Sequence, residues 1–99
     1  MRVEFSDKKL QRLFEDVDFV PARMDQVVIR AFRKKVGLLM QAETEIDILN
    51  LKSLRYKKLK GDREGQKSIR LNDQWRLILL VDSDGSGNYF IVVEIVDHH

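Results

Sequence analysis

The residues best suited to chemistry are Asp97, His98 and His99, which directly follow an apolar, strand-like segment at residues 89–96. A carboxylate and an imidazole on a rigid element can transfer protons near neutral pH, because histidine ordinarily titrates near ~6.5. The simpler interpretation is a polar tail, because terminal residues are commonly frayed. The rest of the sequence bears on the choice between these interpretations.

Basic residues are concentrated in the middle of the sequence. Residues 52–76 contain nine basic and three acidic side chains, although the formal net charge of the whole chain is only +2. Such a strip favours binding to a polyanion. It also fits a solvated edge strand, where lysines oppose aggregation. Charge alone leaves both interpretations open.

Metal-free cleavage of RNA is a reaction that these residue types could perform. It needs a base for the 2′-hydroxyl, cations for the charge on the phosphate, and an acid for the leaving 5′-oxygen. Lys60, Arg63 and Arg76 could supply the cations, and Asp97 and His99 could transfer the protons. Each cation taken singly is more commonly a plain surface charge, so the hypothesis depends on their convergence.

Other kinds of site are disfavoured. The chain has no cysteine, which excludes disulfides, thiolate zinc sites and thiol nucleophiles. Neighbouring strand residues point to opposite faces, so the last three residues could not all hold one metal ion. We therefore expect no metal and no cofactor. The longest apolar run, residues 77–81, is far too short to span a bilayer, and we expect a cytoplasmic protein without membrane contact.

The elements that must position these residues form a single domain over residues 1–99, 43% of which are hydrophobic. Helical spacing predicts one helix over 7–16 with Ser6 as its N-cap, a second beginning at Pro21, and a further turn over 44–50. Strands are predicted at residues 2–5, 55–59, 66–71, 74–81 and 89–96. This order indicates an α+β fold, with two to three N-terminal helices on one face of a mostly antiparallel four- to five-stranded sheet.

The register of the last hairpin predicts which side chains share a face. With a turn over residues 83–88, position 82 lies opposite position 89, and position 76 lies opposite position 95. Arg76 then projects from the same face as Asp97 and His99, whereas Trp75 and Val96 face the helices. The predicted site therefore lies on the face without helices.

The preceding turn predicts the direction of Arg70. A two-residue turn at Asn72 and Asp73 would place Arg70 opposite Trp75, pointing away from Arg76. A bulge would reverse this assignment.

Four strings of residues resemble the HigB/GraT branch of the RelE toxin superfamily. They are Ala-Glu-Thr-Glu-Ile (42–46), Leu-Lys-Gly-Asp-Arg-Glu-Gly (59–65), Ser-Ile-Arg-Leu-Asn-Asp-Gln-Trp-Arg (68–76) and Val-Glu-Ile-Val-Asp-His-His (93–99). The resemblance follows the order of the whole chain and is sharpest over residues 42–99. It implies a microbial-RNase-like (RelE-like) fold and the toxin of a toxin–antitoxin pair, an endoribonuclease that cleaves mRNA in the decoding site of the ribosome.

The same resemblance implies functional residues. The arginine after the tryptophan, the lysine before the glycine, and the terminal acid and histidine of the family correspond to Arg76, Lys60, Asp97 and His99. Contacts to RNA are expected from Lys57, Lys58, Arg63 and His98. Two positions depart from the family: His98 stands where a tyrosine is usual, and Lys57 stands where one branch has a catalytic histidine. The identity of the general base therefore stays open.

The resemblance also implies partners. These are a cognate helix-turn-helix antitoxin that represses the shared operon, and the ribosome with its bound mRNA. DNA is contacted only through the antitoxin complex. Two alternatives remain: a non-catalytic inhibitor of DNA gyrase, similar to the ParE branch, and an RNA-binding module whose basic strip only contacts phosphates.

Overall fold

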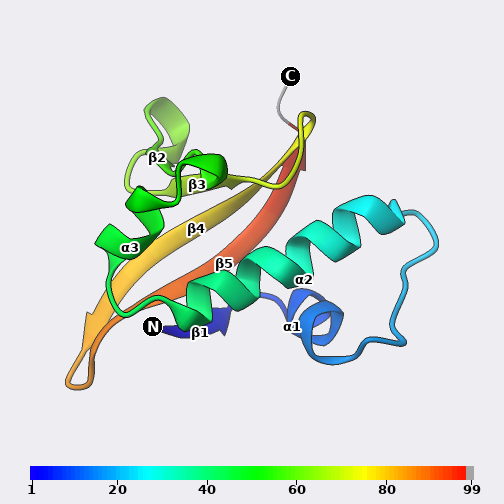
Figure 1. Cartoon of the computed structure of the whole chain (residues 1–99), viewed down its shortest axis with the longest axis horizontal. Helices are drawn as coiled ribbons and strands as arrows, with labels where there is room; N and C mark the ends of the chain where they lie inside the picture. Colours follow the sequence, from blue (N-terminus) through cyan, green and yellow to red (C-terminus); the bar gives the residue numbers. More distant parts are fainter. Residues whose placement is uncertain (98–99) are drawn as a thin grey trace.

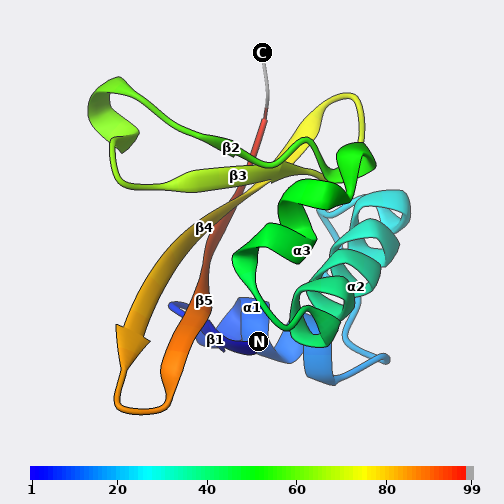
Figure 2. The ribbon, with the colours of Figure 1, turned by 60° about the vertical axis from the view of Figure 1, so that its left-hand side comes forward.

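The computed structural model describes residues 1–97, which form one sheet with the α-helices on a single face (Figures 1 and 2). The elements, in which η marks a 3₁₀ helix, are β1 (Arg2–Phe5), α1 (Lys8–Glu15), α2 (Gln26–Gln41), α3 (Glu45–Asn50), η1 (Lys52–Leu54), β2 (Lys57–Lys58), η2 (Gly61–Arg63), β3 (Lys67–Arg70), β4 (Trp75–Asp84) and β5 (Gly87–Asp97). The five strands lie in the order β1-β5-β4-β3-β2, and only the β1–β5 pair is parallel. The predicted α+β class, with its mostly antiparallel sheet, is confirmed.

The helix starts differ from two sequence predictions. Asp7 rather than Ser6 caps α1, since its carboxylate accepts a hydrogen bond from the backbone N–H of Lys9 at 2.6 Å. The Ser6 hydroxyl instead lies 3.1 Å from the carbonyl of Val92 in β5. The prediction that α2 begins at Pro21 is wrong, because residues 21–24 form a separate turn before the capping residue Asp25.

The core lies between the helices and the sheet. Phe32, Leu39 and Ile48 from the helices pack with the inward side chains of β3, β4 and β5; these strand residues are Ile69, Leu77, Leu79, Phe90 and Val92. All eight side chains are at most 2% exposed. Trp75 is partly buried against this cluster, which confirms that it faces the helices. The opposite face of the sheet, called here the open face, carries no α-helix of residues 1–97 (Figure 2).

The predicted strand at 55–59 is reduced to the two residues of β2. Arg55 adopts a left-handed conformation, with φ 48° and ψ 49°, which interrupts the extended backbone just before β2. On the other side, the N–H of Leu59 donates to the carbonyl of Gln66 at 3.0 Å, and η2 follows. β2 is therefore a short edge strand beside β3.

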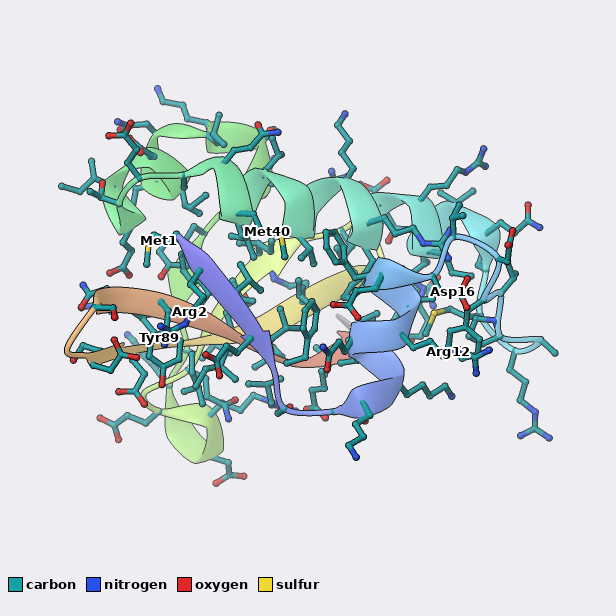
Figure 3. All side chains as sticks on the ribbon, turned by 90° about the horizontal axis from the view of Figure 1, so that it is seen from below. Met1, Arg2, Arg12, Asp16, Met40 and Tyr89 are labelled. Carbon is teal, nitrogen blue, oxygen red and sulfur yellow. The ribbon has the colours of Figure 1, made fainter. Side chains whose placement is uncertain are left out.

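Arg2, on β1, contacts the β4–β5 hairpin near its turn. Its guanidinium lies 4.0 Å from the ring centroid of Tyr89 and 2.6 Å from a carboxylate oxygen of Asp84 (Figure 3). These contacts join β1 to the β4–β5 hairpin at the end away from Arg76.

A charged cluster joins α3 to β3 on the helix side. The Glu45 carboxylate accepts hydrogen bonds from the Tyr56 hydroxyl at 2.5 Å and from the Lys67 ammonium at 2.7 Å. Burial would raise the pKa of Glu45, but the bonds from Lys67 and Tyr56 outweigh it and lower that pKa below its usual 4.5. The ionised carboxylate therefore stabilises the fold.

We expect Glu45→Gln to lower the free energy of unfolding by about 1–2 kcal/mol at pH 7, since charged hydrogen bonds are lost. Because the folded pKa is lowered, this stabilisation is present above pH 4.5 and is lost as the pH falls through the lower folded value. Urea unfolding of both proteins at pH 7 and pH 3 measures the difference. If the difference in unfolding free energy between the two proteins is the same at both pH values, the ionised Glu45 carboxylate is not the source of the stabilisation.

None of the helices in residues 1–97 is both long enough and apolar enough to cross a membrane.

Candidate active site

Arg76 is the centre of the candidate site. It lies on β4 on the open face, yet the residue is only 6% exposed. Its Nε donates to the Ser68 hydroxyl oxygen at 2.9 Å, and its Nη2 donates to the backbone carbonyl of Arg55 at 2.7 Å. The side chain therefore reaches from β4 across β3 to the segment that leads into β2.

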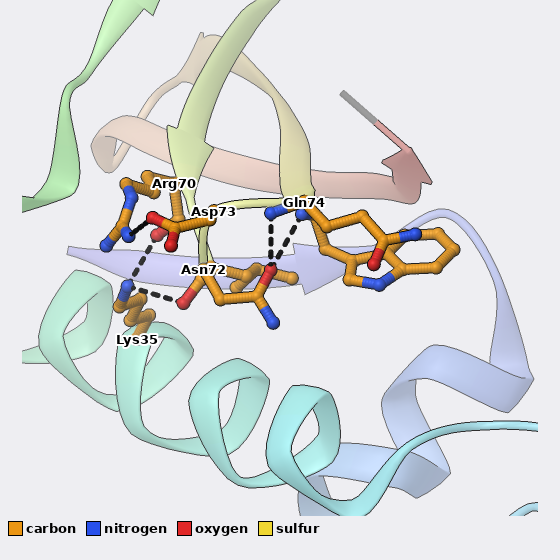
Figure 4. Close-up of polar contacts among 7 residues, drawn as sticks. Lys35, Arg70, Asn72, Asp73 and Gln74 are labelled. Carbon is orange, nitrogen blue, oxygen red and sulfur yellow. Dashed lines mark hydrogen bonds and ion pairs between the residues drawn. The ribbon is translucent and has the colours of Figure 1, made fainter. Parts of the chain in front are cut away.

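Further cations surround this guanidinium. Burial lowers the pKa of Arg76, and repulsion from Arg55 and Arg70 lowers it further. Arg70 is ion-paired with Asp73, whose side chain is 98% exposed (Figure 4). Three neighbouring guanidinium groups create a local positive potential, which favours the binding of an anion such as a phosphate group.

The prediction that Arg70 points away from Arg76 is wrong. The two residues lie directly opposite each other in the β3–β4 pair and share the open face. The turn contains three residues, 72–74, rather than two, because the N–H of Leu71 pairs with the carbonyl of Trp75 at 2.9 Å. The Asn72 side-chain oxygen stabilises this turn by accepting from the N–H groups of residues 74 and 75 (Figure 4).

Lys35 fixes the end of β3 and this turn to the helices. Its ammonium, on α2, donates to the carbonyl oxygens of Arg70 at 2.6 Å and Leu71 at 2.9 Å (Figure 4). Burial lowers the pKa of Lys35, as do nearby cations including Arg70. The backbone beneath Arg70 is thus anchored from the helix side.

The predicted register between Arg76 and Asp97 is also wrong. The pairing of position 82 with position 89 is confirmed, but a bulge in β5 at Val93 shifts the later pairs by one residue. Arg76 therefore lies opposite Val96 rather than Ile95. Val96 consequently lies on the open face, not on the helix face as predicted.

Asp97 lies opposite Trp75, so the register does not place it on the same face as Arg76. Its carboxylate accepts a hydrogen bond from the Gln74 side chain at 3.1 Å. The two remaining predicted residues of this group, His98 and His99, lie outside the described residues. The expected convergence of Arg76 with Asp97 is thus not found.

The predicted lysines divide between the two faces. Lys57 lies opposite Ser68 and shares the open face with Arg76, whereas Lys58 lies opposite Lys67, which reaches the helix side. Lys60 is exposed just before η2. Among residues 1–97, neither Lys57 nor Lys60 has an ion-pair partner. Both ammonium groups are therefore available to an anionic ligand.

Arg63 is held in place rather than free for RNA. Its Nη2 forms an ion pair with Glu94 of β5, and its Nη1 donates to the Gln66 side chain at 2.9 Å. Glu94 lies opposite Ile78, on the open face. This ion pair fixes η2 against the sheet beside the Arg76 site.

Sequence reasoning missed three parts of this site: Ser68, Glu94 and the carbonyl of Arg55. A polar residue in the alternating segment 66–71 was a usable signal for Ser68. No local signal pointed to the contacts of the other two, because each acts on a residue more than 20 positions away.

The described residues offer cationic chemistry rather than a metal centre. Within residues 1–97, no three side chains of the types His, Cys, Asp or Glu come together as a metal site. What they do bring together on one face are Arg70, Arg76 and Lys57, a set suited to a phosphodiester.

Comparison of the sequence with known proteins identifies a family and a relative. Residues 3–99 match the model of a family described as the RelE-like toxin of the type II toxin–antitoxin system HigB. Toxin HigB-1 of Vibrio cholerae is 33% identical over 81 residues, which cover 79% of this chain and 81% of that protein.

Solved structures share the fold at low sequence identity. A YoeB/ParE toxin from Agrobacterium tumefaciens superposes with a TM-score of 0.63 at 16% identity, covering 100% of both chains. A mutant form of YafQ from E. coli gives 0.62 at 14% identity, covering 99% of this chain and 94% of that one. A YoeB–YefM complex from Staphylococcus aureus gives 0.53 at 14% identity, covering 100% of this chain and 98% of that one. The predicted RelE-like architecture is confirmed.

Proposed function

Because this chain belongs to the HigB-like family of RelE-like toxins of type II toxin–antitoxin systems, we propose that it is an endoribonuclease that cleaves ribosome-bound mRNA. The observation that carries the proposal is the buried Arg76, hydrogen-bonded on two nitrogens and surrounded by like charges. A cation held in this way is preorganised for a phosphate group that gains negative charge during the reaction.

In the proposed reaction, the 2′-oxygen attacks the adjacent phosphorus, and the bond to the 5′-oxygen of the next nucleotide breaks. Arg76 stabilises the charge on the non-bridging oxygens, with help from Lys60. Asp97 and His99 transfer the protons. For these two residues the support is the family resemblance of the terminal segment, because the register does not place Asp97 beside Arg76.

The remaining predicted residues contact the message. Lys57 is the best supported, because it shares the open face with Arg76. Lys58 and His98 are proposed as weaker contacts. Arg63 would act on RNA only where a phosphate replaces its partner Glu94.

The proposed partners are a cognate helix-turn-helix antitoxin, which carries the DNA contact of the pair, and the translating ribosome in the cytoplasm. Support for the antitoxin comes from the type II family and from the likeness of this fold to a toxin in a YoeB–YefM complex.

The test is to induce the protein in growing cells and to map the 5′ ends of abundant mRNAs by primer extension. We expect discrete new ends on translated messages, and the same cuts on purified ribosomes carrying mRNA. Uncut messages on purified ribosomes would overturn the proposal.

A second candidate is a non-catalytic inhibitor of DNA gyrase, similar to the ParE branch. It is favoured by one observation: Asp97 lies opposite Trp75, so the register does not place its carboxylate on the same face as the Arg76 guanidinium. Loss of plasmid supercoiling without new mRNA ends would support this candidate.

Lys57, on the open face, and the exposed Lys60 should set the salt dependence of RNA binding. For Lys57→Ala combined with Lys60→Ala, we expect the plot of log affinity against log salt to become shallower. The magnitude of its slope should decrease by about 1.4, at about 0.7 per lost phosphate contact. Fluorescence anisotropy with a labelled single-stranded message measures it. The charge-matched control is Lys8→Ala with Lys34→Ala, because both residues lie exposed on the helices. Equal slopes for the two double variants would rule out Lys57 and Lys60 as phosphate contacts.

A further inference from the structure

Two groups from separate segments hold the guanidinium of Arg76. Ser68, on β3, is 0% exposed, and its hydroxyl oxygen accepts the Nε–H at 2.9 Å. The carbonyl of Arg55, before β2, accepts from Nη2 at 2.7 Å. Nε and Nη2 together form one edge of the guanidinium, so the two contacts fix the plane of the group as well as its position.

The Arg55 carbonyl is presented by an unusual backbone. Arg55 has φ 48°, the one positive φ of a non-glycine residue in residues 1–97. A left-handed conformation is disfavoured for arginine and persists only where the surrounding structure imposes it. Here the left-handed conformation of Arg55 accompanies the hydrogen bond that its carbonyl accepts from the buried Arg76 guanidinium, so a role in holding Arg76 accounts for the unusual backbone.

Three of the five N–H donors of Arg76 are left over. They are the two on Nη1 and the second on Nη2, at the end of the guanidinium. No side-chain nitrogen in the described residues is fully buried without a partner, and Nη1 has no hydrogen-bond partner there, so Nη1 keeps some contact with solvent. This end has the fork geometry that matches two oxygens of one phosphate.

We propose that Ser68 and the main-chain carbonyl of Arg55 are positioning groups, which hold Arg76 so that its Nη1–Nη2 end faces the scissile phosphate. The proposal rests on the proposed nuclease function and adds to it two groups that do not touch the substrate. Without Ser68, the long arginine side chain gains rotamers in which the fork points elsewhere. The bound message is then held almost as well, but the charge of the transition state is stabilised less often.

The test is single-turnover cleavage of ribosome-bound mRNA at rising concentrations of the protein. For Ser68→Ala we expect the maximal rate to fall roughly 10-fold to 100-fold, because a misplacement of about 1 Å can cost 100-fold. We expect the concentration for half-maximal rate to change less than about threefold. Ser68→Thr keeps the hydroxyl on a side chain suited to a strand, and should recover most of the rate.

The matched control is Ile69→Val, a conservative change at the adjacent buried position of β3, whose side chain faces the helices. It should lower thermal stability without lowering the maximal rate. If it slows cleavage as much as Ser68→Ala, the effect of Ser68 is general destabilisation and the proposal fails.

A second readout does not depend on activity. Hydrogen exchange of the Arg76 Nε–H, followed by NMR, should be slow in the wild-type protein and at least about tenfold faster in Ser68→Ala, because the acceptor is gone. Unchanged exchange in a folded Ser68→Ala protein would overturn the positioning role.

The two hypotheses fail in different ways. If Arg76→Ala abolishes cleavage while Ser68→Ala cleaves at the wild-type rate, the positioning proposal is wrong and the nuclease function stands. If the wild-type protein cleaves no message, the nuclease function is wrong and the kinetic role of Ser68 falls with it, whatever the exchange rates show.

Discussion

Arg76→Ala is expected to lower the maximal rate of mRNA cleavage by roughly 10²–10³-fold, the usual cost of removing one donor to a transition state. It should also relieve growth arrest when the protein is induced. The reason is the geometry of the open face, where Arg76 is the most buried of the clustered cations. Single-turnover cleavage on purified ribosomes gives the rate, and urea unfolding shows whether the variant remains folded.

The control for this prediction is Arg12→Ala. Arg12 lies on α1, forms an ion pair with Asp16 at 3.6 Å and packs over the ring of Phe19 (Figure 3). The variant removes the same charge from the helix side of the protein, and we expect the wild-type cleavage rate. Full toxicity of Arg76→Ala would show that the phosphate is not bound where we propose.

His99→Ala is expected to slow cleavage by roughly 10²–10⁴-fold, the range for loss of a general acid or base. The plot of rate against pH should also lose one limb, because a histidine that transfers protons must change its charge within the working range. The measurement is the single-turnover rate between pH 5 and pH 9 on ribosomes that are stable over this range. A wild-type pH profile in His99→Ala would remove His99 from the mechanism.

Two variants locate the other proton-transfer group. Asp97→Asn keeps the shape of the side chain, and we expect it to lower the cleavage rate less than His99→Ala does. The reason is that Asp97 lies opposite Trp75 and accepts a hydrogen bond from the Gln74 side chain. His98→Ala tests the residue that stands in the place of the usual tyrosine. A larger loss for His98→Ala than for His99→Ala would exchange the two proposed roles.

Local patterns were sufficient for most of the elements. Alternation in β4 placed Trp75, Leu77 and Leu79 toward the helices, and their partial or full burial confirms it. This succeeded because strand alternation depends only on the parity of neighbouring residues. The α2 start was predicted wrongly, because the proline signal and the Asp25 cap compete within a few residues and only the cap forms.

The relation between strands could not be derived in the same way. Residues 89–96 are apolar on both parities apart from Glu94, whose charge lies on the parity predicted to face the helices and is the one local sign of the bulge at Val93. The length of the turn at 72–74 could not be predicted either, since Asn72 and Asp73 suit a two-residue turn as well as a three-residue one. Each shifts a register by one residue, and a shift of one residue moves a side chain to the other face.

The amino-acid pattern was enough for the order and type of the main elements, for the basic strip over residues 52–76 and for the family strings that identify a toxin, because composition and spacing are properties of neighbouring residues. Which of those charged groups meet depends on how the strands pair in the folded protein. This pairing brought Arg76 to Ser68 and Arg55, and it placed Asp97 opposite Trp75. These contacts join residues 8 to 22 positions apart, and they are set by strand register and turn length, which local residue preferences do not fix.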